Sequence, residues 1–441
     1  MLSFVKKIHK NNFYLFFIVV ASFLIRFSYV FYFTDYKNYL FSDMVGYWNR
    51  AIDRYNGDIF SMSQWTAWGP FYHFYLTFIF KILTFLHLFN HKLEIVLFLN
   101  IVYSTISVYC LYFISLQVIK NINYSLLITL FYAFSYPLIY LNSFILTESF
   151  ATPILIFSVY LVFAYHEKKL IMFLAGLIFG VAVAARPAMC LMFLPFFLYI
   201  LYARKPDLNS ILRGVIFACG FFLVIFIILA EIFYISKGEL ISLYGSSGAT
   251  FFLFQCKHSV MESTSRGYYF VIAPPFTSNN HPGWEVFKTD HPLHDQRYFY
   301  ELGLQCMKKN SHFLLDGFKS LKALFFTYLF PSVGSAANFA LLINLSNYFI
   351  FFMTIMLGFL YFLLKDKVVE IKKILFLISL LLCTIIMSFF FPPEQRYLYP
   401  VLFTIYLLFF TVILHVKKYK QQFLNYIRAI VVAYFAYLFL H

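Results

Sequence analysis

The sequence predicts an all-α membrane protein that crosses the bilayer many times. Hydrophobic residues make up 62% of the 441 positions, charged residues make up 12%, and the mean hydropathy is +0.77. Soluble domains have about 45–50% apolar and about 25% charged residues, so this chain lies well outside that class. Apolar runs long enough to cross a bilayer also recur along the whole chain. We therefore expect a polytopic helical bundle.

Eleven apolar runs approach the roughly 17 to 25 residues that a membrane helix needs. They lie near 13–34, 93–119, 122–141, 148–165, 170–186, 188–203, 211–236, 339–364, 372–391, 398–416 and 423–440. The first run follows Lys6, Lys7 and Lys10, and no small-residue cleavage site comes after it. We expect this segment to be a retained first helix and not a cleaved signal peptide.

Short basic clusters between the apolar runs predict the orientation of the chain. They lie at the N-terminus and at 168–169, 204–213, 365–373 and 417–420. This distribution of the net charge of +15 follows the positive-inside rule and does not indicate a nucleic-acid partner. A cytoplasmic N-terminus then places the turn at Arg186-Pro187, the loop 237–320 and the segment 392–400 on the extracytoplasmic side.

The run at 70–89 is the weakest candidate for a membrane span. From an outside first loop (35–69) to the inside cluster at 168–169 the chain must cross an odd number of times, yet four apolar runs lie between. The run at 70–89 carries His73, Lys81 and His87 and begins at Gly69-Pro70. We expect it to lie in the interface or to re-enter. The alternative, in which it spans and a later run does not, stays open.

Three regions follow from this topology. Residues 1–236 form an N-terminal transmembrane module with the first outside loop at 35–69, residues 237–320 form an extracytoplasmic loop with membrane-proximal helices, and residues 321–441 form the C-terminal transmembrane helices. Within the loop, Gly245-Ser246-Ser247-Gly248 lacks the lysine and helix of a phosphate-binding loop, so we interpret it as a flexible turn.

Two of the six cysteines lie outside the predicted spans. Cys256 and Cys306 fall in the extracytoplasmic loop, where an oxidising compartment permits a disulfide between them. The sequence leaves open whether they form this disulfide or remain free thiols.

Four charged residues lie next to apolar runs without belonging to the basic clusters: Asp43, Glu148, Arg186 and Arg396. A charge at the centre of a membrane helix costs roughly 2.5 to 3.5 kcal/mol, so such residues often mark a site. Each of them alone is explained by a side chain that reaches water at the interface. All four, however, fall on the predicted extracytoplasmic face, and this convergence predicts a site.

The four residues divide into two chemical roles. Asp43 can cap the helix that follows Ser42, or it can act as a catalytic base or metal-binding carboxylate. Arg186 and Arg396 suit an anionic ligand, because the guanidinium fork matches phosphate oxygens. The alternative for Arg396 is an anchor for the helix end, paired with Glu394.

These motifs and their order resemble the integral-membrane C-type (GT-C) glycosyltransferases, the group that contains protein O-mannosyltransferases and lipid A aminoarabinose transferases. The resemblance extends over about residues 13–416. Its parts are Ser42-Asp43 with Tyr47, Gly69-Pro70, Leu146-Thr147-Glu148, Ala184-Ala185-Arg186-Pro187, Gln395-Arg396-Tyr397 with Pro400, and the segment 298–325.

The resemblance implies a GT-C-like fold and the transfer of a sugar from a polyprenyl-phosphate donor to a lipid, glycan or protein acceptor at the extracytoplasmic face. It implies that Asp43 is catalytic, that Arg186 and Arg396 bind the donor phosphate, and that Glu148, Tyr47 and Tyr397 contact substrate. A divalent metal, held by Asp43 and Glu148, stays open.

Two alternative functions use the same residues. A transporter or flippase of a lipid-linked sugar needs phosphate-binding arginines, but many such proteins have two similar halves, and the sequence has no such internal symmetry. A ligase that joins a whole glycan to an acceptor is the other alternative. We expect a multi-pass protein of the bacterial inner membrane, with membrane lipids as further partners.

Overall fold

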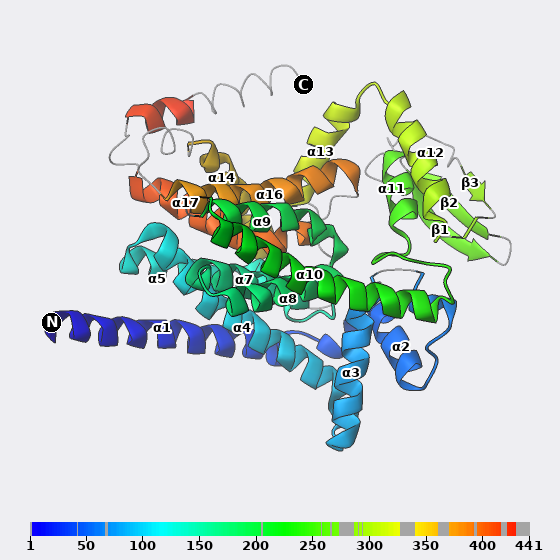
Figure 1. Ribbon diagram of the computed structural model, residues 1–441, viewed down its shortest axis with the longest axis horizontal. Coiled ribbons are helices and arrows are strands. Elements are labelled where there is room, and N and C mark those ends of the chain that lie inside the picture. Colours follow the sequence, from blue (N-terminus) through cyan, green and yellow to red (C-terminus); the bar gives the residue numbers. More distant parts are fainter. Residues whose placement is uncertain are drawn as a thin grey trace.

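A bundle of long apolar helices makes up most of the computed structural model, with a smaller helical and β region at one end (Figure 1). The structure describes residues 2–41, 43–66, 69–203, 206–256, 258–264, 267–272, 286–289, 291–292, 294–326, 340–359, 370–391, 395–415 and 421–428.

Most of the bundle comes from the first 235 residues. Its helices are α1 (Leu2–Ser28) with the π-helical η1 (Tyr29–Phe33), α4 (Lys92–Ile119), α5 (Ile122–Ala133), α6 (Tyr136–Leu141), α7 (Thr147–Tyr165), α8 (Lys169–Ala185), η5 (Pro187–Met192), α9 (Phe193–Tyr202) and α10 (Leu208–Ile235). The C-terminal part adds α14 (Ala340–Met356), η7 (Leu357–Phe359), α16 (Ile371–Phe390), η8 (Gln395–Val401) and α17 (Leu402–His415).

Small residues let α8 and α10 pack with their backbones in close approach. A Cβ atom added to Gly176 would lie 2.1 Å from the carbonyl oxygen of Phe217, and one added to Gly220 would lie 2.3 Å from that of Phe173. Glycine at such crossings is a common device for packing membrane helices. This contact fixes α8, and with it the position of Arg186 at its end.

Six helices of the described chain are long and apolar enough to cross a membrane, and each coincides with a predicted span: Phe13–Phe33, Phe89–Ile119, Thr147–Tyr165, Leu208–Ile235, Ile371–Phe390 and Arg396–His415. The predicted runs at 170–186, 188–203 and 339–364 correspond to shorter helices, and the run at 122–141 is divided into α5 and α6. Most of 423–440 lies outside the described residues. The helical, membrane-type architecture agrees with the sequence, while the count of eleven spans stays a prediction.

The run at 70–89 forms α3 (Phe71–Phe85), which is one of the shorter apolar helices. It extends across the direction of the long helices, next to α2 (Asp43–Tyr55) (Figure 1). Short 3-10 turns, η2 (Tyr36–Asn38), η3 (Met62–Gln64) and η4 (Phe89–His91), complete this part of the chain. The interfacial or re-entrant position of this run stays a prediction.

Lys120 and two lysines of the basic cluster at 365–373 meet at one end of the bundle. Lys120 forms an ion pair with Glu370. Lys372 donates to the carbonyl of Ala203 at 3.2 Å, and Lys373 donates to that of Gln117 at 3.0 Å. From this end α16 extends for 20 residues, about 30 Å at roughly 1.5 Å per residue. The helix therefore separates the basic end from the opposite end of the bundle by the thickness of a bilayer core.

The loop 237–320 folds into α11 (Ser247–Gln255), α12 (Gln296–Lys309), the start of α13 (Phe313–Phe326) and a three-stranded antiparallel sheet in the order β1 (His258–Thr264), β2 (Gly267–Ile272) and β3 (Val286–Thr289). β1 bulges between Val260 and Glu262. A disulfide between Cys256 and Cys306 joins the ends of α11 and α12, with their Cα atoms 5.3 Å apart.

The sheet is a difference from the all-α prediction. The aromatic and β-branched residues of β2, from Tyr268 to Ile272, have high strand propensity, and they are too few to register as an apolar run. The interpretation of Gly245 to Gly248 as a turn holds for Gly245 and Ser246 alone, since Ser247 begins α11. The loop contains helices as expected, and their position next to the membrane stays a prediction.

Candidate functional site

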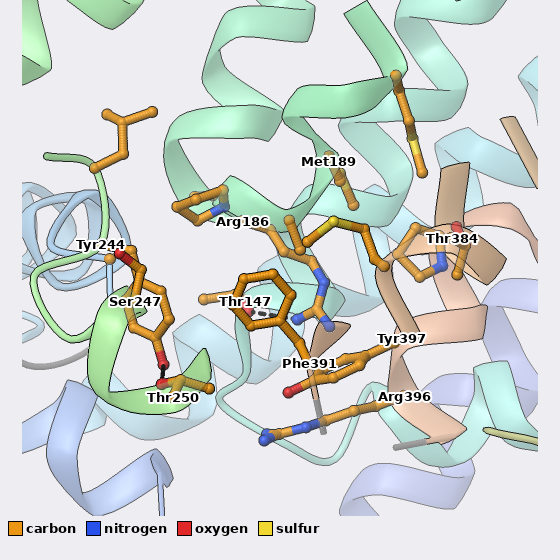
Figure 2. A pocket seen from close by; sticks show the side chains of 18 of the residues that line it. Thr147, Arg186, Met189, Tyr244, Ser247, Thr250, Thr384, Phe391, Arg396 and Tyr397 are labelled. Atoms are coloured by element: carbon orange, nitrogen blue, oxygen red, sulfur yellow. Dashed lines mark hydrogen bonds between the residues drawn. The ribbon is translucent and has the colours of Figure 1, made fainter. Parts of the chain in front are cut away.

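A cavity of about 310 Å³ lies where α8 and α16 end, next to the start of α2 and α7 (Figure 2). Asp43, Arg186 and Arg396, which lie far apart in the sequence, all line it. The other lining residues are Tyr47, Gly69, Thr147, Ala185, Pro187, Ala188, Met189, Met192, Ser242, Leu243, Tyr244, Ser247, Thr250, Tyr300, Thr384, Met387, Phe391, Tyr397 and Pro400. The cavity is therefore at the end of the bundle opposite the contacts of Lys120, Lys372 and Lys373.

Four charged groups form one ion-pair network at this cavity. Arg396 Nη1 lies 2.7 Å from Asp43 Oδ2, and Arg396 Nε lies 3.4 Å from Glu148 Oε1. Arg186 Nη1 lies 2.6 Å from the same oxygen of Glu148. The Glu148 side chain is 1% exposed and lies behind the two arginines instead of lining the cavity. Thus Glu148 holds both guanidinium groups in place, and Asp43 pairs with Arg396 from the cavity side.

Glu148 and Arg186 are positioned by the ends of their helices. Glu148 lies in the first turn of α7, where the helix dipole favours a carboxylate. Thr147 Oγ1 donates to Glu148 Oε2 at 2.9 Å and accepts from Arg186 Nη1 at 3.2 Å. Arg186 follows the last residue of α8 and precedes Pro187, which restricts it to an extended conformation (φ −138°, ψ 86°) and so ends the helix.

Tyr397 lies against both arginines. Its ring centroid is 4.6 Å from the Cζ of Arg186 and 5.7 Å from the Cζ of Arg396, within the range of cation–π contacts. Figure 2 shows this ring between the two guanidinium groups. Tyr397 therefore helps to keep two like charges side by side. The alternative partner of Arg396, Glu394, lies outside the described residues.

Asp43 and Tyr47 lie one turn apart on α2, and both line the cavity. Asp43 is in the first turn of α2, so helix stabilisation remains one of its roles, and its carboxylate also pairs with Arg396. Burial raises the pKa of Tyr47 well above its usual value, and the charges of Asp43 and Glu148 raise it further. Tyr47 therefore stays protonated and offers a neutral hydroxyl to the cavity.

The segment that joins α10 to α11, together with α11 and α12, contributes a wall of hydroxyl groups that the sequence analysis did not identify. Ser242, Tyr244, Ser247 and Thr250 line the cavity, together with Tyr300 of α12. Tyr244 and Thr250 are hydrogen-bonded through their hydroxyls at 3.2 Å. The signal in the sequence was the cluster of Ser, Tyr and Thr around Gly245 to Gly248, which lacked the pattern of any known loop.

A third wall is apolar. Met189 and Met192 of η5 face the cavity together with Met387 of α16 and Phe391, which follows it. Methionine side chains adapt to irregular apolar ligands. The cavity is thus lined by three kinds of surface: the charged side chains of Asp43, Arg186 and Arg396, the hydroxyl wall and the apolar wall.

The donor set does not fit a resident divalent metal. Both Asp43 and Glu148 face guanidinium groups, which already supply the positive charge that a metal would bring. Among the residues that the structure describes, no group of three or more His, Cys, Asp or Glu side chains is arranged to hold a metal ion. A metal held by Asp43 and Glu148 would have to displace both arginines.

One further charged residue was overlooked, although it lies inside the first predicted span. Arg26 of α1 is fully buried. Its Nε donates to Ser104 Oγ at 2.9 Å and its Nη1 donates to the carbonyl of Ala133 at 2.7 Å. Ala133 ends α5, just before the break that separates it from α6. Arg26 therefore supports this break and does not line the cavity.

No protein-family model matches this chain, and no curated protein sequence matches it. Its function must therefore be argued from the cavity itself.

Proposed function

We propose that this chain is a GT-C-like membrane glycosyltransferase. It transfers a sugar from a polyprenyl-phosphate donor to a lipid, glycan or protein acceptor at the extracytoplasmic face, and the bacterial inner membrane is the proposed location. The observation that carries the proposal is a pair of cavity-lining arginines at the end of an apolar bundle, both held by the buried Glu148, with the cavity-facing Asp43 paired to Arg396.

The arginines suit the phosphate of the donor. Each guanidinium presents a planar set of donors that match phosphate oxygens and stays charged when partly desolvated. Arg186 Nη2 is buried and has no hydrogen-bond partner among the described residues, so it has a donor left for a ligand. The apolar wall with Met189, Met192 and Met387 suits the first isoprene units of the carrier.

Charge balance suggests how the donor activates the site. The network holds two arginines and two carboxylates, which sum to zero formal charge. A phosphodiester brings one negative charge, which competes with Asp43 for Arg396. Glu148 is buried behind the arginines and continues to hold them. Donor binding therefore releases Asp43 from its partner as an ionised carboxylate.

The released Asp43 then acts as a general base. It takes the proton of the acceptor hydroxyl while the acceptor oxygen forms a bond to the anomeric carbon of the sugar. The bond between that carbon and the phosphate oxygen breaks, and its electron pair leaves with the phosphate. Arg186 and Arg396 stabilise this leaving group. A single displacement of this kind inverts the anomeric configuration.

The proposal is tested with purified protein in vesicles that contain a polyprenyl-phosphate sugar and an acceptor extract. We expect release of polyprenyl phosphate and appearance of the sugar on the acceptor. Movement of the intact donor across the vesicle membrane without its cleavage would contradict the proposal and indicate a flippase. Transfer of preassembled glycans, without transfer of single sugars, would indicate a ligase.

A further inference from the structure

The hydroxyl wall, formed by Ser242, Tyr244, Ser247, Thr250 and Tyr300, has no role in the chemistry described so far. All five residues lie outside the long bundle helices, in the segment that joins α10 to α11 and in α11 and α12. In Figure 2, Tyr244, Ser247 and Thr250 lie on one side of Arg186, and Thr384 of α16 lies on the other. The wall therefore faces the cavity from the side opposite α16.

We infer that this wall recognises the transferred group, and that this group is a neutral sugar. The inference rests on the proposed function and extends it to the class of donor. Its basis is the chemistry of the wall, which offers several hydroxyl groups and no charge next to a charged phosphate subsite.

Hydroxyl groups suit a sugar because each both donates and accepts hydrogen bonds. Thr250 Oγ1 donates to the carbonyl of Ser246 at 3.0 Å, so the 3.2 Å contact with Tyr244 uses the hydrogen of Tyr244. The Tyr244 oxygen also has a hydrogen bond with the Ser246 side chain, and its second lone pair is left to accept from a sugar hydroxyl. Burial raises the pKa of Tyr244, which keeps this hydroxyl neutral. The hydrogen bond to Thr250 thus orients the Tyr244 hydroxyl so that its oxygen can accept a hydrogen bond from a sugar hydroxyl.

Charge excludes an amino sugar from this wall. Among the described lining residues Asp43 is the one carboxylate, and in the proposed reaction it takes the proton of the acceptor once the donor has freed it from Arg396, so it does not also serve as the partner of a sugar ammonium group. A sugar ammonium group would lie near the positive charges of Arg186 and Arg396 without a carboxylate of its own. Like charges in such a setting are strongly unfavourable, so the wall selects against a cationic sugar.

The backbone around the wall is fixed, which allows it to discriminate between ligands. A Cβ atom at Gly245 would lie 2.5 Å from the carbonyl oxygen of Trp65, and one at Gly248 would lie 2.7 Å from that of Gln296. Gln296 Nε2 also donates to the carbonyl of Tyr244 at 3.0 Å. The disulfide between Cys256 and Cys306 also joins α11 to α12, at the C-terminal end of α11.

The test compares two ligands, polyprenyl phosphate and a polyprenyl-phosphate hexose, by their dissociation constants for the purified protein in detergent. We expect the hexose to tighten binding to the wild-type protein by about 10-fold or more. The variants Tyr244→Phe and Thr250→Val should lose most of this gain and keep the affinity for bare polyprenyl phosphate. Tyr234→Phe and Thr354→Val, which lie outside the cavity, are the matched controls and should behave as wild type.

Other results would overturn the inference. A 4-amino sugar donor that binds as tightly as the neutral hexose would contradict the charge argument. Equal losses for both ligands in Tyr244→Phe would show that the wall supports the fold and does not read the sugar. Failure of the wild-type protein to bind polyprenyl phosphate at all would contradict the proposed function as well, whereas phosphate binding without a gain from the hexose would contradict this inference alone.

Discussion

The guanidinium of Arg396 joins Asp43 to Glu148, with contacts of 2.7 Å and 3.4 Å. One side chain thereby connects the first turn of α2, in the first outside loop, to the first turn of α7. Because Asp43 faces the cavity and Glu148 does not, an anionic ligand can replace the first carboxylate without disturbing the second. This asymmetry suits Asp43 to the proposed role of base and Glu148 to a supporting role.

Replacement of Arg396 by lysine should impair donor use more than it impairs the fold. Lysine keeps the charge but loses the planar fork that contacts two carboxylates and that, in the proposed function, binds the donor phosphate. We expect kcat/KM for the polyprenyl-phosphate donor to fall about 100-fold, which corresponds to roughly 2.7 kcal/mol. Steady-state kinetics measure this effect. Arg297→Lys is the control because Arg297 is exposed and pairs within α12, and equal kinetics for the two variants would contradict the phosphate role.

Glu148→Gln should destabilise the protein. The change leaves Arg186 without its carboxylate partner in a buried setting and weakens the support of Arg396. Breaking a buried pair by removing one partner costs about 3 to 5 kcal/mol. Unfolding in detergent, followed by intrinsic fluorescence, should show a loss of this size. Glu301→Gln in the exposed pair with Arg297 should change stability by less than about 1 kcal/mol. Comparable losses of stability in Glu148→Gln and Glu301→Gln would contradict the supporting role of Glu148.

His73 should make stability depend on pH. Burial lowers its pKa well below the ordinary value, and the charges of Arg50 and Arg54 lower it further, so the folded protein holds it neutral. The unfolded chain protonates this histidine below about pH 6.5. The contribution of His73 to the free energy of unfolding is therefore complete above pH 6.5. It is lost, at up to about 1.4 kcal/mol per pH unit, as the pH falls toward the pKa of His73 in the folded protein.

The measurement is the free energy of unfolding between pH 7.5 and 5 for the wild-type protein and for His73→Phe. The wild-type curve should fall more steeply below pH 6.5, since the variant lacks the titrating ring. Parallel curves would mean that His73 does not stay neutral in the fold.

Cysteine labelling should resolve the direction of the chain around α3. Asn90 and Asn123 are exposed and lie at opposite ends of α4. The background is a variant without the four free cysteines. In intact cells Asn90→Cys should react with a membrane-impermeant thiol reagent. Asn123→Cys should react with the same reagent only after the cells are lysed. The opposite pattern would mean that α3 crosses the membrane and that a later apolar run does not.

Part of the site could be predicted because charge is rare in this chain. Asp43, Glu148, Arg186 and Arg396 are conspicuous beside apolar runs. The positive-inside rule predicts that they lie at one face, provided that the run at 70–89 does not span. Arg26 escaped the same reasoning because a single arginine in a span has the same composition signature whether it reaches water or, as here, is fully buried. Nothing in the sequence indicates that Arg26 contacts the carbonyl of Ala133.

The hydroxyl wall could not be predicted, since it depends on contacts between distant segments. Tyr244 and Thr250 reach the cavity because Gly245 lets the chain pass close to the backbone of Trp65 and because Gln296 holds the carbonyl of Tyr244. Serine, threonine and glycine in a loop predict a turn, but they do not predict the direction in which its side chains point. The position of Glu148 behind the arginines has the same origin, because its burial depends on how α7 packs.

The most direct test of the account is single-turnover cleavage of a radiolabelled polyprenyl-phosphate hexose by Asp43→Asn. This variant keeps the shape of the side chain and removes the base. We predict that it binds the donor at least as tightly as the wild type, because Arg396 loses a competing charge, and that release of polyprenyl phosphate falls at least about 100-fold. Asp53→Asn, on the exposed side of the same helix, should cleave at the wild-type rate. Cleavage by Asp43→Asn at the wild-type rate would contradict the account.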